Sequence, residues 1–155
     1  MITIKVRLTH MYRHIHDLLS NKNSAPQLAQ LDESILSIIQ TMSHHNIGSV
    51  IIMDEDRNIA GIVTERIIIN ALNQNFSLNK LHASDIMKPC SELVILPPEA
   101  MIRDAMQLMT EKKCRHIPIM INDELIGIIS IGDITKFIID NQKQEINSLR
   151  EYITQ

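Results

Sequence analysis

The chain has 155 residues, 45% hydrophobic and 21% charged, so we expect a globular protein with enough apolar residues for one continuous core. A formal net charge of -3 argues against a general binder of nucleic acid or anionic membranes, and 3% aromatic residues without tryptophan leave few stacking surfaces for single strands. Two cysteines make no disulfide framework and no apolar stretch reaches membrane-spanning length, so we expect a cytoplasmic location.

The first half of the chain alternates helical and extended patterns. Residues 9–20 carry apolar residues at helical spacing, and residues 27–31 fit a short strand. Asp32 is expected to cap a helix that runs to about His45. Two Ile/Val-rich strands follow, joined by a polar turn, and Thr64 begins another helix. A polar connector from residue 73 then leads to a short helical turn at residues 85–89.

The second half repeats this order. In sequence we expect a strand at 93–96, a helix at 99–113, strands at 115–121 and 125–131 around a turn at 122–124, and a final helix from Ser130 to about residue 150. The two copies align by eye, with Met42 opposite Met109 and Gly48 opposite Arg115, at an offset of 67 residues that becomes 66 after the second turn. The sequence therefore predicts an α/β (α+β) fold of two β-α-β-β-α repeats packed together.

This periodicity gives a division of the chain. We expect an N-terminal helix and loop, a first repeat, a connector, a second repeat and a C-terminal helical extension, at residues 1–26, 27–75, 76–90, 91–142 and 143–155.

Ser130 and Asp133 are the candidate binding residues that stand out. Ser130 lies where an apolar strand meets a helix, so free backbone N–H groups and the helix dipole favour an anion such as phosphate there. Asp133, one helical turn on, is placed to accept hydrogen bonds from a cis-diol such as ribose. The alternative is a capping arrangement in which the serine caps the helix and the acid accepts from its first N–H groups.

The first repeat has only part of this pattern. Thr64 keeps the hydroxyl, and Arg66 offers a cation for phosphate oxygens, but Ile67 stands where the second copy has Asp133. Because isoleucine accepts no hydrogen bond from a ribose, we expect one competent nucleotide site per chain, centred on the second repeat, with Thr64 and Arg66 reaching toward its phosphates.

The order of elements, the phrase Arg115-His116-Ile117-Pro118-Ile119, and the two strand endings at residues 61–66 and 127–133 resemble a tandem pair of CBS domains, also called a Bateman module. The resemblance covers about residues 10–142 and implies two repeats related by a pseudo-two-fold. It implies a stand-alone regulatory, energy-sensing module that binds AMP, ADP, ATP or S-adenosylmethionine between the repeats. It also implies a homodimeric disc of four repeats.

The resemblance further suggests roles for the residues around the serine and acid. It places the Ile117–Ile119 backbone beside an adenine, with Arg115 within reach of phosphate and His116, Pro118 and Ile128 lining the same site. The ligand-binding set is thus Ser130, Asp133, Arg115, His116, Ile117, Pro118, Ile128, Thr64 and Arg66.

The sequence leaves two other functions open. A structural dimerisation or partner-binding module that has lost its ligand is one alternative, and its partner surface would be sought in the charged tail from residue 143 to 151. An enzyme acting on the nucleotide is the weaker one, because we find no Ser/His/Asp arrangement, no Gly-rich phosphate loop and no paired carboxylates. His10, His14 and His16 lack the spacing of an established metal motif, so we expect no metal and no required cofactor.

Overall fold

The structure, a computed structural model, describes residues 13–22, 24–74 and 76–153, with only the backbone described from residue 151 onward. Contacts divide the chain into two compact units that are discontinuous in sequence. Unit 1 takes residues 1–23, 95–121 and 128–155, and unit 2 takes residues 24–94 and 122–127. Within the described part of the chain, no helix is both long and apolar enough to cross a membrane.

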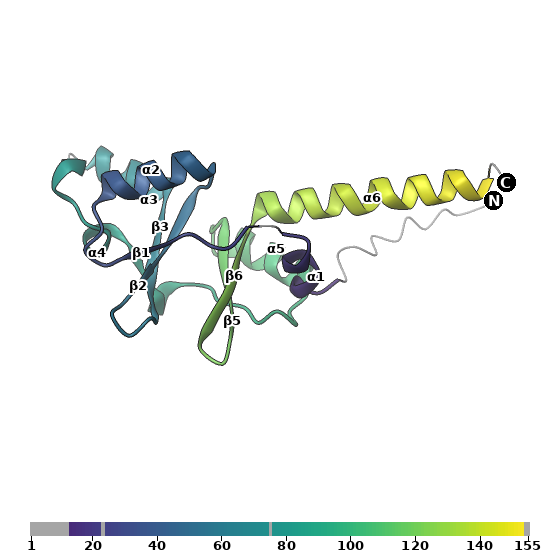
Figure 1. Cartoon of the computed structure of the whole chain (residues 1–155), viewed down its shortest axis with the longest axis horizontal. Coiled ribbons are helices and arrows are strands. Elements are labelled where there is room, and N and C mark those ends of the chain that lie inside the picture. Colours follow the sequence, from purple (N-terminus) through teal and green to yellow (C-terminus); the bar gives the residue numbers. More distant parts are fainter. Residues whose placement is uncertain (1–12, 23, 75, 154–155) are drawn as a thin grey trace. The chain divides into compact units, whose positions relative to one another are not determined.

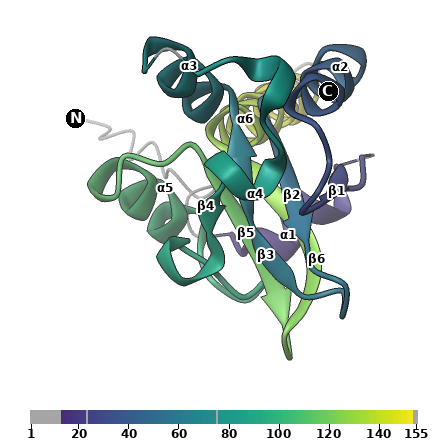
Figure 2. The ribbon, with the colours of Figure 1, turned by 90° about the vertical axis from the view of Figure 1, so that its left-hand side faces the viewer.

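Unit 2 contains a four-stranded sheet in the order β1-β2-β3-β4 (Figure 2). Its strands are β1 (Leu28–Gln30), β2 (Ser49–Met53), β3 (Ile59–Thr64) and β4 (Lys88–Pro89). β1 runs parallel to β2, whereas β2 with β3 and β3 with β4 are antiparallel. The predicted strand at 27–31 and the first hairpin are confirmed. The helical turn predicted at residues 85–89 is wrong beyond Ile86, because Lys88–Pro89 form β4, and a lysine and a proline carry no strand pattern by themselves.

Three α-helices complete this unit, namely α2 (Ile35–His45), α3 (Glu65–Asn73) and α4 (Ala83–Ile86). Ile35, Ile38 and Met42 of α2 are buried against Val50 and other residues of the sheet, as the apolar stripe of that helix predicts. The predicted cap at Asp32 is wrong: Ser34 caps α2, and its Oγ accepts a hydrogen bond from the N–H of Ser37 at 3.2 Å. Two 3-10 turns, Leu78–Lys80 and Cys90–Glu92, interrupt the connector region.

Unit 1 contains the helices α1 (Ile15–Ser20), α5 (Ile102–Glu111) and α6 (Ile131–Ile153). The strands β5 (His116–Ile121) and β6 (Glu124–Ser130) form a two-stranded sheet, although residues 122–127 group with unit 2. α6 continues as one straight rod well past α1 and α5 (Figure 1). The predicted helix at 9–20 is confirmed from Ile15 onward, while residues 9–12 lie outside the described part of the chain.

Matching hydrogen bonds confirm that the two halves are copies. The N–H of Ile47 donates to the carbonyl of Met42 at 3.0 Å, and that of Cys114 donates to Met109 at 3.1 Å. The first residue of the helix after each hairpin donates its backbone N–H to the carbonyl of the residue that precedes the hairpin. Glu65 donates to Gly48 at 3.1 Å, and Ile131 donates to Arg115 at 3.0 Å. The paired donors and acceptors of the two halves are 67 or 66 residues apart, the same offsets that align the two copies in the sequence.

The predicted strand at 93–96 is reduced to one bridge, in which Leu96 pairs in parallel with Ile119. In the first repeat the N–H of Ile51 donates to the carbonyl of Gln27 at 3.0 Å and extends this pairing. The equivalent of Ile51 is Pro118, which has no N–H to donate. The second repeat therefore cannot make that ladder bond, and its first strand shortens.

α1 and α4 are also equivalent, and each pairs with the start of the other repeat's helix. His14 bridges to Met101, before α5, and His82 bridges to Ser34, before α2. Both helices begin with His-x-x-Asp, whose acid accepts from the N–H of the histidine, at 3.3 Å for Asp17 and 2.8 Å for Asp85. Each unit thus combines one repeat with the helix that precedes the other repeat.

Candidate functional site

Ser130 and Asp133 meet at the junction of β6 and α6, as the sequence predicts. The N–H and the hydroxyl of Ser130 donate to Oδ2 of Asp133, at 2.8 and 2.9 Å. In return, the N–H of Asp133 donates to Oγ of Ser130 at 3.1 Å. These reciprocal bonds are the capping box that was the alternative interpretation, so the structure shows that the two residues cap α6. A capping role does not by itself exclude a ligand, because it occupies one carboxylate oxygen only.

A lysine that the sequence did not bring forward completes this cluster. The ammonium of Lys22, in the loop after α1, donates to Oδ2 of Asp133 and to the backbone carbonyl of Ile128, both at 2.8 Å. The side chains of Lys22 and Asp133 are 21% and 27% exposed, so the ion pair is largely shielded from water. Among the described residues, Oδ1 of Asp133 accepts no hydrogen bond, which leaves it available to a ligand hydroxyl.

The electrostatics of the cluster favour the ionised acid. Burial by itself raises the pKa of Asp133, but the Lys22 ammonium and the two donors of Ser130 oppose it, and together they hold the pKa below its ordinary value. The carboxylate therefore stays charged at neutral pH and remains an acceptor for hydroxyl groups.

This lowered pKa predicts a pH-dependent contribution to folding. An acid whose pKa is lower in the folded than in the unfolded state stabilises the fold fully at pH values above its unfolded-state pKa, which is near 3.8. That contribution is lost as the pH falls through the folded-state pKa. We expect the unfolding free energy of the wild type to exceed that of Asp133→Asn by more at pH 6 than at pH 3, measured by urea denaturation. An equal difference at both pH values would contradict this assignment.

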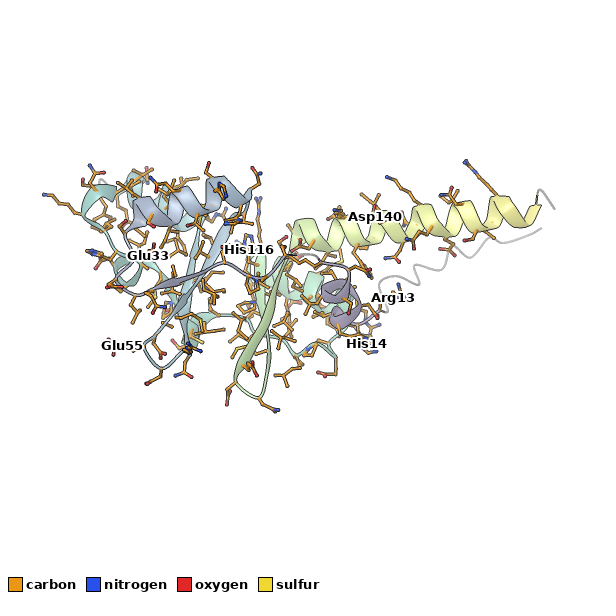
Figure 3. The ribbon with its side chains drawn as sticks, in the orientation of Figure 1. Arg13, His14, Glu33, Glu55, His116 and Asp140 are labelled. Atoms are coloured by element: carbon orange, nitrogen blue, oxygen red, sulfur yellow. The ribbon has the colours of Figure 1, made fainter. Side chains whose placement is uncertain are left out.

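The other predicted residues of the second repeat lie on β5, β6 and the turn before β5. Ile117 and Pro118 are buried, while Ile128 and His116, which is labelled in Figure 3, are half-buried. Arg115 is exposed, and its backbone carbonyl is tied to the first residue of α6. This chain segment therefore belongs to the same unit as Ser130 and Asp133, with one charged side chain open to solvent.

Thr64 and Arg66 belong to unit 2, so their part in the site stays a prediction. Thr64 caps α3, its Oγ1 accepting from the N–H of Ile67 at 3.3 Å. Ile67 returns no bond, whereas Asp133 does so in the second repeat. The serine-acid clamp is therefore complete only at α6.

Lys22 was missed because it lies 111 residues from Asp133 in a polar loop without a motif. A signal existed in the repeat, since aligning His14 with His82 places Lys22 opposite Cys90. The two copies therefore differ twice: lysine and aspartate in one, cysteine and isoleucine in the other. Both members of the ion pair belong to unit 1, and unit 2 has Cys90 and Ile67 at the equivalent positions.

The histidines of the N-terminal segment have structural contacts. Nδ1 of His14 (labelled in Figure 3) lies 2.6 Å from the carbonyl oxygen of Glu99. The His14 ring also stacks on that of His16, with ring centroids 5.5 Å apart. His10 lies outside the described residues. Within the described part of the chain, no three His, Cys, Asp or Glu residues gather as metal ligands would.

Two solved structures of similar fold have ligands in their names. One is a CBS-domain protein of Pyrobaculum aerophilum in complex with AMP, at 20% identity and a TM-score of 0.69, with 78% of this chain and 89% of that chain covered. The other is the CBS-domain pair of protein MJ0100 with 5'-methylthioadenosine and S-adenosyl-L-methionine, at 21% identity and a TM-score of 0.72, with 84% and 98% covered. At these identities they show that the fold is shared.

More similar proteins support a closer relation. A mitochondrial CBS-domain protein of Arabidopsis thaliana, CBSX3, is 30% identical over 146 residues, which cover 90% of this chain and 71% of the plant protein. Some curated relatives are longer, and the chain spans 36% of one from Thermofilum pendens. A CBS-domain protein of Agrobacterium tumefaciens is 31% identical with a TM-score of 0.75, covering 82% of this chain and 94% of that one. The CBS-domain family model matches residues 23–74 and 83–140. The chain therefore belongs to the CBS-domain family and carries two copies of the domain.

Proposed function

We propose that this protein is a regulatory module that binds one adenosine compound per chain at the second repeat. The CBS-domain pair is known as a regulatory module for adenine nucleotides and S-adenosylmethionine. The neighbours that bind AMP and S-adenosylmethionine support the choice of ligand class. AMP, ADP, ATP and S-adenosylmethionine are the candidate ligands.

One observation carries the proposal: Asp133 is held by its Oδ2 through Ser130 and Lys22, and its Oδ1 accepts no hydrogen bond among the described residues. A ribose cis-diol donates hydrogen bonds well to a fixed carboxylate. Ser130 caps α6, a helix of 23 residues, and the N-terminus of this helix also favours a phosphate. Arg115 supplies a further cation from the turn before β5, and the backbone of residues 117–119 would flank the adenine.

Calorimetric titration with AMP, ATP and S-adenosylmethionine tests the proposal. We expect one molecule bound per chain, because unit 2 has Ile67 and Cys90 where unit 1 has Asp133 and Lys22. A thermal-shift panel with the same ligands gives an independent reading, since a ligand that binds only the folded state raises the midpoint of unfolding by mass action. Two molecules per chain, or no binding by any of them, would contradict the proposal.

The alternative is a structural dimerisation module without a ligand. The reciprocal Ser130–Asp133 hydrogen bonds are compatible with this alternative, because helix capping alone would require the same bonds. A scaffold would show no thermal shift with any adenosine compound. Incubation with ATP, followed by an assay for released phosphate or AMP, separates a sensor from an enzyme; CBS-domain pairs are generally regulatory rather than catalytic.

Further features belong to this proposal. We expect a homodimer of four repeats in a disc, a cytoplasmic location, a role in sensing cellular energy, and a protein target that responds to changed packing of the repeats or of the two chains. A ligand shifts such packing only by the difference between its affinities for the two arrangements.

A further inference from the structure

Lys22 has a fixed position in unit 1. The backbone N–H of Lys22 donates to the carbonyl of Leu19 at 3.0 Å, at the end of α1. This helix is anchored by the buried side chains of Ile15 and Leu18, which are 0% and 3% exposed. From there its ammonium reaches the end of β6 and the start of α6. The side chain thus has a defined place beside the candidate acid.

An ammonium group carries three N–H donors, and two of those of Lys22 are used by Ile128 and Asp133. The third has no acceptor among the described residues. The side chain is 21% exposed, so part of it can be reached from solvent.

The charge of Lys22 changes what Asp133 can tolerate nearby. A carboxylate alone would bind ribose hydroxyls but repel a phosphate attached to the same sugar. Lys22 cancels that charge within 2.8 Å, so the pair is neutral as a whole. The comparison of the two units points the same way, because unit 2 has Cys90 and Ile67 where unit 1 has Lys22 and Asp133.

We propose that Lys22 sets the ligand charge at this site: with it, the second repeat prefers anionic adenosine 5'-phosphates to S-adenosylmethionine, whose sulfonium is cationic. This inference rests on the proposed function and selects among its candidate ligands. Lys22 acts as a specificity-determining residue, through its charge and its remaining N–H, while Asp133 binds the ribose.

Titrations with AMP, adenosine and S-adenosylmethionine test this on the wild type and four variants. Lys22→Met removes the charge and the donors; Lys22→Gln removes the charge and keeps hydrogen-bond donors; Lys22→Arg keeps the charge. Lys143→Met is the control, because it removes the same charge from an exposed position on α6. Thermal unfolding of each variant identifies any that fails to fold, and Lys22→Gln then replaces Lys22→Met.

We expect the wild type to bind AMP more tightly than S-adenosylmethionine. Both neutral variants should bind AMP about tenfold more weakly and should change the affinity for adenosine less than threefold. They should also reverse or remove the preference for AMP over S-adenosylmethionine. Lys22→Arg should stay within threefold of the wild type for AMP, and Lys143→Met should match it.

Four results would overturn the inference. Unchanged AMP affinity in both neutral variants would show that the charge is not used. Equal weakening of AMP and adenosine binding would show that Lys22 only positions Asp133. A wild type that prefers S-adenosylmethionine contradicts the inference although the proposed function stands. A wild type that binds none of the three, and no ATP, contradicts both.

Discussion

Asp133→Ala is expected to weaken the binding of AMP about a hundredfold and to destabilise unit 1. Two hydrogen bonds from a ribose to a charged acceptor, at about 1.5 kcal/mol each, correspond to a factor of this size. The same change leaves Lys22, 21% exposed, without its counter-charge and removes the acceptor for the N–H of Ser130. We expect a loss of about 2 kcal/mol in unfolding free energy, in keeping with hydrogen bonds to charged groups.

Asp85→Ala is the matched control for this variant. Asp85 accepts from the N–H of His82 at the start of α4, as Asp133 does from Ser130, but its side chain is 47% exposed and its ion-pair partner is a histidine. We expect a loss of about 0.5 kcal/mol, typical of an acid near a helix N-terminus, and unchanged AMP affinity. Calorimetry and urea denaturation measure the two effects separately. AMP affinity that is the same in Asp133→Ala and the wild type would refute the assignment of Asp133.

Gly61→Ala is expected to disrupt the sheet of unit 2. Gly61 lies on β3 opposite Pro89 of β4, and a Cβ added to it would clash with the backbone carbonyl oxygen of Lys88. Because that atom belongs to the main chain, relief requires β4 to shift away from β3. Overpacking of this kind typically costs about 1–3 kcal/mol, and we expect the upper part of that range by urea denaturation.

Gly132→Ala tests the same chemical change where there is room. Among the described residues, a Cβ at Gly132, in the first turn of α6, would meet Oγ of Ser130 at an ordinary 3.6 Å. Alanine is the better helix former by about 1 kcal/mol, so this variant should be as stable as the wild type or more so. If Gly61→Ala and Gly132→Ala change the unfolding free energy equally, β4 does not restrict residue 61 as described.

The predicted helices and hairpins were found where their signals are local. The Ile/Val-rich pairs of strands, the turns at residues 54–58 and 122–124, and the helices after Thr64 and Ser130 depend on residues close together in sequence. The shortened first strand of the second repeat follows from Pro118, whose missing N–H is visible in the sequence but whose effect depends on which carbonyl it would have met.

The two-repeat plan, the Ser130–Asp133 motif and its loss at Ile67 can be read from the amino-acid sequence, because they depend on spacing within one element or on comparison between copies. The folded chain was needed to show that α1 and α4 pair with each other's repeats, that β4 adds an edge strand to the first sheet, and that Lys22 neutralises Asp133. Each of these joins segments whose contact depends on the path of the whole chain, and a charge in a loop carries no local sign of the partner it will meet.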